Sequence, residues 1–498
     1  MLTFLAFLPL AGLCSAQAIS FCVASSPVPQ AAPIDPSPVG FSYDFGFDEW
    51  WFNVSNTRAC HATLKSLTGQ WPVVRLAGGM DDTAVFDPNL PVTRMDANIT
   101  GLADALYYGP RYFTEVLAKY PGPIIFGLNR GADNITNTII AAKYMKKLLP
   151  NLIATEIGNE PDIYAATGAH YGSSESAPQL IVVNAGGVNA WTPAKEAMSA
   201  VQWQLAIGEA LQEPHIIQIG GYVAPIWYTN ATYLLSQETP EAFKYIKSFS
   251  HHFYPQSVYP LSISGAPNLT ELMSHANISA NVAEFAIDRV STDEHGMAYI
   301  FGETNTVSGG GSPIISPTFG SSLYILDYVL RAASSKIVRL NFHFQSYGTS
   351  YYIWWDKAGV RSPYYGGYVA AEVLAGQSYI AALDDGTTNY AGYEVYSKSK
   401  RLSKVVLINT DYFDGNGTRS SKEFTLTGLA AKSVSAKRLT ATSAMSRQDF
   451  GDAPTYGGRS FSDLGCHLSG KEVIEEVPLK GGKAKLTVFA SEAIVVTL

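Results

Sequence analysis

Short apolar runs alternate with longer amphipathic segments along most of the first 385 residues. Eight apolar runs have the length of a buried strand: 40–47, 73–76, 124–128, 153–157, 216–219, 249–253, 299–302 and 339–344. Helical spacing fits the segments 110–119, 137–149, 193–211, 241–248 and 320–333. Thr192 before Pro193 is a helix-start signal. Such alternation predicts an α/β fold, a (β/α)8 TIM barrel.

The pattern changes after Asp384-Asp385-Gly386. Helical spacing disappears, and clusters of Gly, Asn and Ser separate short strand-like runs at 392–397, 405–409, 423–427, 434–440, 473–477, 484–489 and 493–498. This arrangement is typical of an antiparallel β-sandwich. We therefore expect a catalytic barrel over residues 36–385 and a C-terminal β-sandwich over 386–498.

The first eighteen residues have the features of a signal peptide. Residues 2–13 are almost wholly apolar, and Ala16-Gln17-Ala18 fits the small-x-small cleavage rule. Seven Asn-X-Ser/Thr sequons follow, at Asn53, Asn98, Asn134, Asn230, Asn268, Asn277 and Asn416. After the signal, no run of about 18 apolar residues is long enough to span a membrane. The sequence predicts a secreted, extracellular glycoprotein.

The charge and composition of the chain indicate which kinds of molecule it binds. The chain has a net charge of −8, with 15% charged and 12% aromatic residues. An acidic chain of this kind argues against a nucleic-acid or membrane-surface partner. Abundant Tyr and Phe suit a pocket that offers flat apolar faces and hydroxyls to a sugar.

Cysteine and histidine usage indicates neither a metal site nor a cofactor. Without the signal, the chain keeps Cys22, Cys60 and Cys466, which allow at most one internal disulfide. His61 and His467 each adjoin a Cys, but neither pair has the spacing of a zinc site. We expect no metal and no cofactor.

Two glutamates end apolar runs in the barrel region. Glu160 lies in Gly158-Asn159-Glu160-Pro161, and Glu303 closes the run that begins at Tyr299. Barrel enzymes keep their chemistry at the C-terminal ends of the strands, where both would lie. Each Glu alone reads equally well as a solvated charge at a strand end. Together they form the pair that glycoside hydrolysis requires, one carboxyl to protonate and one carboxylate to attack.

These motifs resemble glycoside hydrolase family 79, in clan A of the retaining glycosidases. The resemblance rests on Asn159-Glu160-Pro161 and Gly302-Glu303-Thr304-Asn305, and extends over the barrel and the sandwich. The family holds fungal and bacterial β-glucuronidases and heparanase. Membership implies Glu160 as general acid/base and Glu303 as nucleophile.

The resemblance also implies roles around the pair. Asn159 would bond the sugar 2-hydroxyl, and Tyr254 would donate its hydroxyl to Glu303. Arg75 would keep Glu303 ionised, with a structural ion pair beneath the site as an equal alternative. Of His251 and His252, one would line the site and the other would pack in the core, because neighbours on a strand point to opposite faces.

For the sugar carboxylate, the resemblance implies neutral donors. Tyr352 is the candidate reader, with Tyr351 as the alternative, and the Ser308-Gly309 loop would present N–H groups. The family also implies that residues 19–35 join the sandwich, from which we expect a Cys22–Cys466 disulfide.

The expected function is that of a monomeric exo-β-glucuronidase acting on a carbohydrate, with 4-O-methyl-glucuronides as a further possible substrate. The alternatives are an endo-acting, heparanase-like enzyme, an arabinofuranosidase, or a carbohydrate-binding protein without catalysis. An endo enzyme on sulfated chains requires a basic cleft, and the sequence has no basic cluster.

Overall fold

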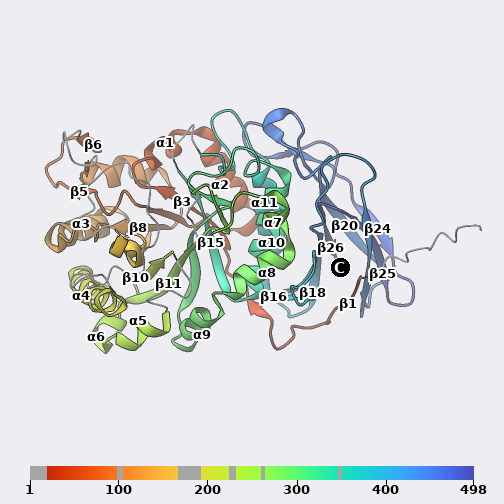
Figure 1. Ribbon diagram of the computed structural model, residues 1–498, viewed down its shortest axis with the longest axis horizontal. Coiled ribbons are helices and arrows are strands. Elements are labelled where there is room, and N and C mark those ends of the chain that lie inside the picture. Colours follow the sequence, from red (N-terminus) through yellow and green to blue (C-terminus); the bar gives the residue numbers. More distant parts are fainter. Residues whose placement is uncertain (1–18, 98–104, 167–191, 224–230, 260–263, 346–349) are drawn as a thin grey trace, which may run out of the picture.

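The structure is a computed structural model that describes residues 19–97, 105–166, 192–223, 231–259, 264–345 and 350–498. The expected signal peptide and two of the sequons, Asn98 and Asn230, lie outside these ranges. Figure 1 shows a barrel with its surrounding helices next to a β-sandwich, with α10 and α11 between the two.

Eight parallel strands close into a barrel in chain order, which confirms the TIM-barrel prediction. They are β3 (Val39–Asp44), β4 (Val74–Ala77), β8 (Ile124–Leu128), β9 (Leu152–Ile157), β10 (Ile217–Tyr222), β11 (Ile246–Phe253), β13 (Ala298–Thr304) and β15 (Ile337–Phe344). The last strand, β15, pairs with the first, β3, and so closes the barrel.

Strand β3 shows how the alternation of side chains divides the barrel wall. Phe41 and Tyr43 are fully buried and pack on outer aromatic side chains such as Trp355 and Phe344. Ser42, between them, accepts a hydrogen bond from Arg75. The outer face of the strand therefore builds the core, while the inner face carries polar groups toward the barrel axis.

The helices cover the outside of the barrel (Figure 1). They are α1 (Asp48–Asn53), α2 (Ser55–Thr68), α3 (Ile135–Leu148), α4 (Pro193–Leu211), α5 (Ala231–Gln237), α6 (Pro240–Phe243), α7 (Leu269–Met273), α8 (His275–Ala283), α9 (Ala286–Glu294), α10 (Phe319–Ser334) and α11 (Pro363–Leu374). Within the described ranges, no helix combines the length and the apolar character needed to cross a bilayer.

Helix α4 begins as the sequence predicts, because the Thr192 side chain accepts a hydrogen bond from Lys195 N. Two other expectations were wrong in part. Residues 110–119 form a π-helical turn (η1, Tyr112–Val116) and a 3-10 turn (η2, Leu117–Lys119). Residues 241–248 do not form one helix, because α6 ends at Phe243 and β11 begins at Ile246.

The C-terminal part is a sandwich of two sheets, as predicted. The larger sheet contains, in order, β2 (Ala32–Pro33), β16 (Gln377–Ala382), β17 (Tyr390–Ser397), β18 (Leu402–Asn409), β26 (Glu492–Thr497), β20 (Ser433–Thr440) and β21 (Thr455–Tyr456), with β24 (Glu475–Pro478) on β20. The smaller sheet contains β1 (Ile19–Cys22), β19 (Ser421–Thr427) and β25 (Ala484–Phe489). The N-terminal segment thus joins the sandwich, with β1 parallel to β19.

The sandwich begins earlier than the sequence suggested. Strand β16 lies in residues assigned to the barrel, yet it pairs antiparallel with β17 in the sandwich sheet. Asp384-Asp385-Gly386 therefore belongs to a β16–β17 hairpin connection and marks no domain border. Turn residues have the same composition in a hairpin and in a linker, so the pattern alone could not separate the two.

The remaining elements are short. They are β5 (Val85–Phe86), β6 (Arg94–Ala97) and β7 (Ala105–Tyr108) in one small sheet, β12 (Gln256–Ser257) with β14 (Val307–Ser308), β22 (Ser460–Phe461) with β23 (Leu468–Ser469), and the 3-10 turns η3 (Pro161–Ala166) and η4 (Gln448–Phe450).

The expected Cys22–Cys466 disulfide is wrong. Cys60 on α2 is bonded to Cys466, and Cys22 is a free, exposed thiol on β1. The expectation placed Cys466 within the sandwich sheets, but the segment around it folds back onto α2, where Gly465 N donates to Asn56 Oδ1. The disulfide therefore ties the barrel to the C-terminal domain.

A buried polar cluster also joins the two parts. His275 of α8 bonds Asp327 of α10 through Nδ1 and Asp384 of the β16–β17 connection through Nε2, each at 2.8 Å. The Tyr393 hydroxyl on β17 donates to Asp327 at 2.5 Å. Barrel and sandwich are thus held together by hydrogen bonds as well as by apolar packing.

Candidate active site

Glu160 follows β9 at the C-terminal end of the barrel. Its backbone φ is +49°, a left-handed conformation that costs a residue with a side chain about 1–3 kcal/mol. Pro161 follows it and cannot donate to a strand ladder. Asp82 holds the turn from below by accepting hydrogen bonds from Asn159 N at 2.9 Å and Tyr164 Oη at 2.6 Å. The strained turn keeps Glu160 out of the sheet.

Glu303 lies near the end of β13, and both of its carboxylate oxygens are held. Oε2 accepts from Arg75 Nη1 at 2.8 Å, and Oε1 accepts from Tyr254 Oη at 2.8 Å. The residue is only 8% exposed. Two donors therefore fix both the orientation and the ionised form of this carboxylate.

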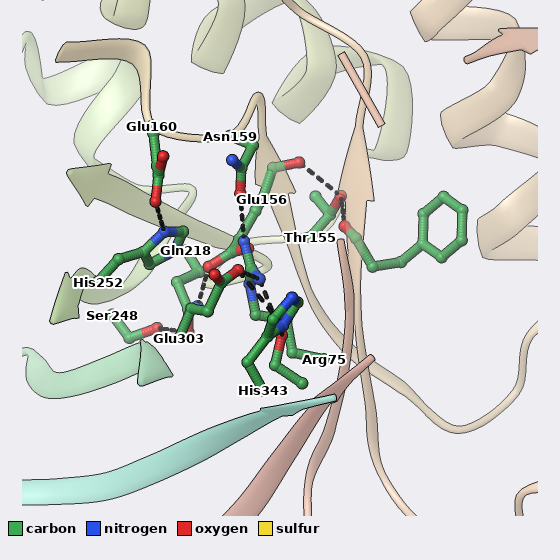
Figure 2. A network of polar contacts seen from close by, with 12 residues as sticks. Arg75, Thr155, Glu156, Asn159, Glu160, Gln218, Ser248, His252, Glu303 and His343 are labelled. Atoms are coloured by element: carbon green, nitrogen blue, oxygen red, sulfur yellow. Dashed lines mark hydrogen bonds and ion pairs between the residues drawn. The ribbon is translucent and has the colours of Figure 1, made fainter. Parts of the chain in front are cut away.

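Glu160 and Glu303 face one another across the barrel mouth, with His252 beside them (Figure 2). One carboxylate oxygen of each Glu and one ring nitrogen of His252 lie within 4.8 Å of one another. His252 Nδ1 is 3.0 Å from Glu160 Oε1. The short separation suits a retaining glycosidase, whose carboxyl groups lie about 5–5.5 Å apart, because an inverting pair needs about 6.5–9.5 Å.

The electrostatics of the pair separate the two roles. Burial raises the pKa of Glu303, but the charges of His343, His252 and Arg75 together lower it to about 2. Burial lowers the pKa of His343 to about 4, whereas Arg75 keeps its charge throughout and always lowers the pKa of Glu303. Glu303 is consequently ionised over the whole range in which the enzyme would work.

Arg75 is completely buried and donates to four side chains. Besides Glu303, it bonds Glu156 through Nε at 2.5 Å, Ser42 through Nη1 at 3.0 Å and Asn159 through Nη2 at 3.0 Å. The sequence left two positions open for Arg75, beside Glu303 or in a structural ion pair beneath the site. The structure combines them, because Arg75 bonds Glu303 and also forms an ion pair with Glu156.

The contact with Arg75 orients the Asn159 amide. Arg is a donor only, so Asn159 must present Oδ1 to it. The amide nitrogen of Asn159 is then left as a donor at the same level as Glu160. Such a donor is what a sugar hydroxyl next to the reacting carbon would require.

A polar chain continues beneath Arg75. Gln218 Nε2 donates to Glu156 Oε1 at 2.5 Å, and Ser248 Oγ donates to Gln218 Oε1 at 2.9 Å. Gly302 leaves room for it, because a Cβ there would meet Ser250 Oγ and approach Glu156. Figure 2 shows Ser248, Gln218 and Glu156 of this chain close to Arg75 and Glu303.

The residues expected to read the sugar carboxylate belong to the segments that follow β13 and β15. The Tyr352 ring stacks on that of Tyr254, with centroids 6.4 Å apart, and is only 2% exposed. Tyr351 is 41% exposed, and its N–H donates to Gly310 O. Ser308 donates to Ser257, and Gly309 adopts φ +78°. The glycine loop is thus attached to the Tyr351–Tyr352 segment.

His251 and His252 of β11 divide as the alternation of side chains along a strand requires. His252 faces Glu160, whereas His251 is enclosed by Tyr299 and Phe285. Sequence reasoning did not single out His343, which approaches Glu303 to 3.6 Å from β15. Its one sequence signal is its place near the end of the last barrel strand.

Glu160, His252 and Glu303 have the spacing of a metal-binding group. Glu303, however, already bonds the permanent cation of Arg75, and His252 Nδ1 is engaged with Glu160. A second cation would have to enter against the charge of Arg75. The geometry therefore favours an organic substrate at this position.

A TIM barrel with two carboxylates within 4.8 Å of each other, one of them held ionised, defines a glycoside hydrolase of the paired-carboxylate type. The chain is 34% identical to the crystallised 4-O-α-L-rhamnosyl-β-D-glucuronidase of Fusarium oxysporum 12S, with a TM-score of 0.87 over 96% of this chain and 100% of that one. Residues 392–495 match the family model described as "Glycosyl hydrolase family 79 C-terminal beta domain". The chain belongs to glycoside hydrolase family 79.

Two curated fungal proteins are similar over most of their length. The β-glucuronidase of Aspergillus niger is 27% identical over 443 residues, which cover 80% of this chain and 76% of that protein. The β-glucuronidase of Neurospora crassa is 25% identical over 453 residues, which cover 78% of this chain and 75% of that protein.

Proposed function

We propose that this chain is a retaining exo-β-glucuronidase, with Glu160 as general acid/base and Glu303 as nucleophile. The observation that carries the proposal is the carboxylate pair itself, within 4.8 Å, with the pKa of Glu303 lowered to about 2. Glu303 is ionised and bonded to the permanent cation of Arg75, whereas Glu160 is bonded to His252, so the attacking and protonating roles fall to different groups.

The reaction would proceed in two steps. Glu303 attacks the anomeric carbon while Glu160 transfers its proton to the departing oxygen, so the glycosidic bond breaks as a glycosyl ester forms. Glu160, now a carboxylate, then takes a proton from water, and that water cleaves the ester. The Asn159 amide would donate to the sugar 2-hydroxyl, a contact that strengthens in the transition state.

The choice of a glucuronide is supported by three similar proteins whose names all describe glucuronidases. For the sugar carboxylate we favour Tyr352 over Tyr351, because Tyr352 is buried against Tyr254 while Tyr351 is largely exposed. Hydroxyls and the N–H groups of the Ser308–Gly309 loop would bind the carboxylate as charge-assisted donors.

Secretion and glycosylation belong to the same proposal. Five sequons lie in described residues, and the Asn is exposed in each: Asn53, Asn134, Asn268, Asn277 and Asn416. Exposure is what an N-glycan requires. Action as a monomer is part of the same proposal.

Release of 4-nitrophenol from a panel of β-glycosides tests the activity. We expect the glucuronide to be cleaved at least 100-fold faster than the glucoside, the galactoside and the arabinofuranoside, because three relatives act on glucuronides. Proton NMR of the first product should show the β-anomer, and an α-anomer would exclude the retaining mechanism.

A second candidate substrate is a glucuronide substituted at O4. The Fusarium oxysporum relative, at 34% identity, is named for a 4-O-rhamnosyl-glucuronide. The panel should therefore include O4-rhamnosylated and O4-methylated aryl glucuronides. Faster turnover of either than of the unsubstituted glucuronide would assign the substituted sugar as the substrate.

A further inference from the structure

A cavity separate from the carboxylate pair lies on the outer side of the barrel wall. It measures about 230 Å³ and lies between α1, α2 and the segment before β8. Trp71 and Pro121 line it and precede strands β4 and β8, and His61 of α2 contacts Tyr43 on the outer face of β3, so the cavity lies between the barrel wall and these outer segments. Glu160 and Glu303 lie in the mouth of the barrel, at the C-terminal ends of the strands. The cavity is therefore separate from the catalytic site.

Its walls are mainly aromatic. The rings of Phe52 and Tyr120 are parallel, with an interplanar angle of 3° and centroids 5.9 Å apart. Trp71 meets Tyr120 edge-on at 6.0 Å, and both Trp71 and Phe52 are half-buried. Flat apolar faces that remain open to a cavity suit the C–H faces of a sugar ring.

A buried polar atom in the wall has no partner. His61 lines the cavity and is 1% exposed, and its Nε2 lies 3.1 Å from the Tyr43 hydroxyl. Its other ring nitrogen, Nδ1, is buried and has no hydrogen bond from the described residues. Burial lowers the pKa of His61 to about 3, so the ring is neutral and can accept or donate one hydrogen bond. A buried polar atom without a partner is costly unless a ligand or water satisfies it.

The rim of the cavity is basic, although the chain as a whole is acidic. Arg58 and Lys119 line it and are exposed. Lys65 lies with Nζ 5.0 Å from the centre of the Trp71 ring. Lys119 donates to Asn53 Oδ1 at 2.9 Å, which holds its charge at the rim. Three cations around an aromatic cavity complement a sugar that carries a carboxylate.

We propose that this cavity is a second carbohydrate-binding site, which takes one acidic sugar residue of a glucuronate-bearing chain. Its volume, about 230 Å³, suits one ring, since pockets for larger ligands measure about 300–1,000 Å³. The aromatic faces would contact the ring, His61 a hydroxyl, and the basic rim the carboxylate. The choice of glucuronate as the acidic sugar rests on the proposed function, whereas the site itself rests on the cavity.

Affinity gel electrophoresis with a glucuronate-bearing polysaccharide in the gel tests the proposal. All variants carry Glu303→Gln, so that the polysaccharide is not hydrolysed. We expect Arg58→Glu/Lys119→Glu to raise the dissociation constant at least fivefold, and Trp71→Ala to weaken binding similarly without a change of charge. The matched control is Lys398→Glu/Lys471→Glu, which reverses two exposed charges on the sandwich.

The proposal would be overturned if the polysaccharide gel retarded the rim variants and Trp71→Ala as strongly as it retards the control. Asn53 is a sequon at the rim, so Asn53→Gln must be run in parallel. If the polysaccharide binds only to Asn53→Gln, the glycan on Asn53 occupies the cavity in the unaltered chain. That result would also overturn the proposal. In the wild-type background, the rim variants should keep kcat/KM for 4-nitrophenyl glucuronide within twofold. That assay reports on the proposed activity independently and shows that the variants are folded.

Discussion

Arg75 Nη1 lies 2.8 Å from Glu303 Oε2, and Arg75 Nε lies 2.5 Å from Glu156 Oε2. One buried guanidinium is thus shared between the carboxylate that would attack the sugar and a carboxylate beneath it. The arrangement keeps Glu303 charged in a place where burial alone would favour its neutral form. It also links the chemistry at the barrel mouth to the packing below.

Removing the Arg75 charge should shift the pH profile. The acid limb of kcat/KM reports the pKa of Glu303 in the free enzyme, which is about 2. Without that cation, the burial of Glu303 raises its pKa, so activity is lost at a higher pH on acidification. The test is the pH dependence of kcat/KM for Arg75→Gln/Glu156→Gln, in which Glu156 is neutralised so that Glu303 is the one carboxylate deprived of its Arg75 partner. Glu156→Gln alone is the control, and an acid limb that does not move would contradict the assigned role of Arg75.

The two catalytic assignments predict different defects. Glu303→Gln should abolish turnover of every glycoside, because the attacking group is lost. Glu160→Gln loses only proton transfer, so it should still form the glycosyl-enzyme from an activated aryl glucuronide and fail on natural glycosides. Azide should rescue Glu160→Ala and give a β-glycosyl azide, which product NMR would identify. Rescue of Glu303→Ala with an α-linked product, while Glu160→Ala stays inactive, would reverse the assignments.

Tyr352→Phe should reduce selectivity for the sugar carboxylate. A charge-assisted hydrogen bond is worth about 1.5–3 kcal/mol, so glucuronide turnover should fall roughly 10-fold or more while glucoside turnover is unchanged. Tyr351→Phe is the matched control, because its side chain is 41% exposed. Unchanged preference for glucuronide in Tyr352→Phe would transfer the role to Tyr351 or to the glycine loop.

The His275 cluster should make the folded chain less stable as the pH becomes alkaline. Burial lowers the pKa of His275, but Asp327 and Asp384 outweigh it and raise the pKa to about 10. A raised pKa stabilises the folded state fully below the unfolded value of about 6.5, and the stabilisation is lost as the pH rises through about 10. Thermal unfolding of wild type and His275→Gln between pH 6 and pH 10.5 measures it. The Tm difference should shrink toward pH 10.5, and a constant difference would argue against a charged His275.

Opening the Cys60–Cys466 disulfide should destabilise the chain. It closes a loop across a sequence separation of 406 residues, and disulfides contribute roughly 2–5 kcal/mol. We expect a lower Tm for Cys466→Ser and no change for Cys22→Ser, since Cys22 is free and exposed. Peptide mapping without reduction should yield a Cys60–Cys466 pair. A linked Cys22 peptide would refute the assignment.

The sequence by itself determined the barrel, the sandwich and the two catalytic candidates. Strand length and apolar content are local properties, so all eight barrel strands can be located from the chain, and Glu160 and Glu303 are recognisable because they lie at the C-terminal ends of two of those strands. The N-cap at Thr192 is likewise local and was predicted correctly. Family resemblance added the roles of Arg75 and Tyr254.

Only the tertiary structure decided which distant groups meet. Pairing of Cys466 with Cys60 depends on a loop that folds back onto α2, and the place of β16 in the sandwich depends on a hairpin partner. The 3.6 Å approach of His343 to Glu303 and the sharing of Arg75 with Glu156 arise from strands far apart in the chain. Local periodicity indicates which face of a helix or strand is buried. It does not indicate which residues of distant elements come into contact, because that depends on how the barrel closes and where the loops fold.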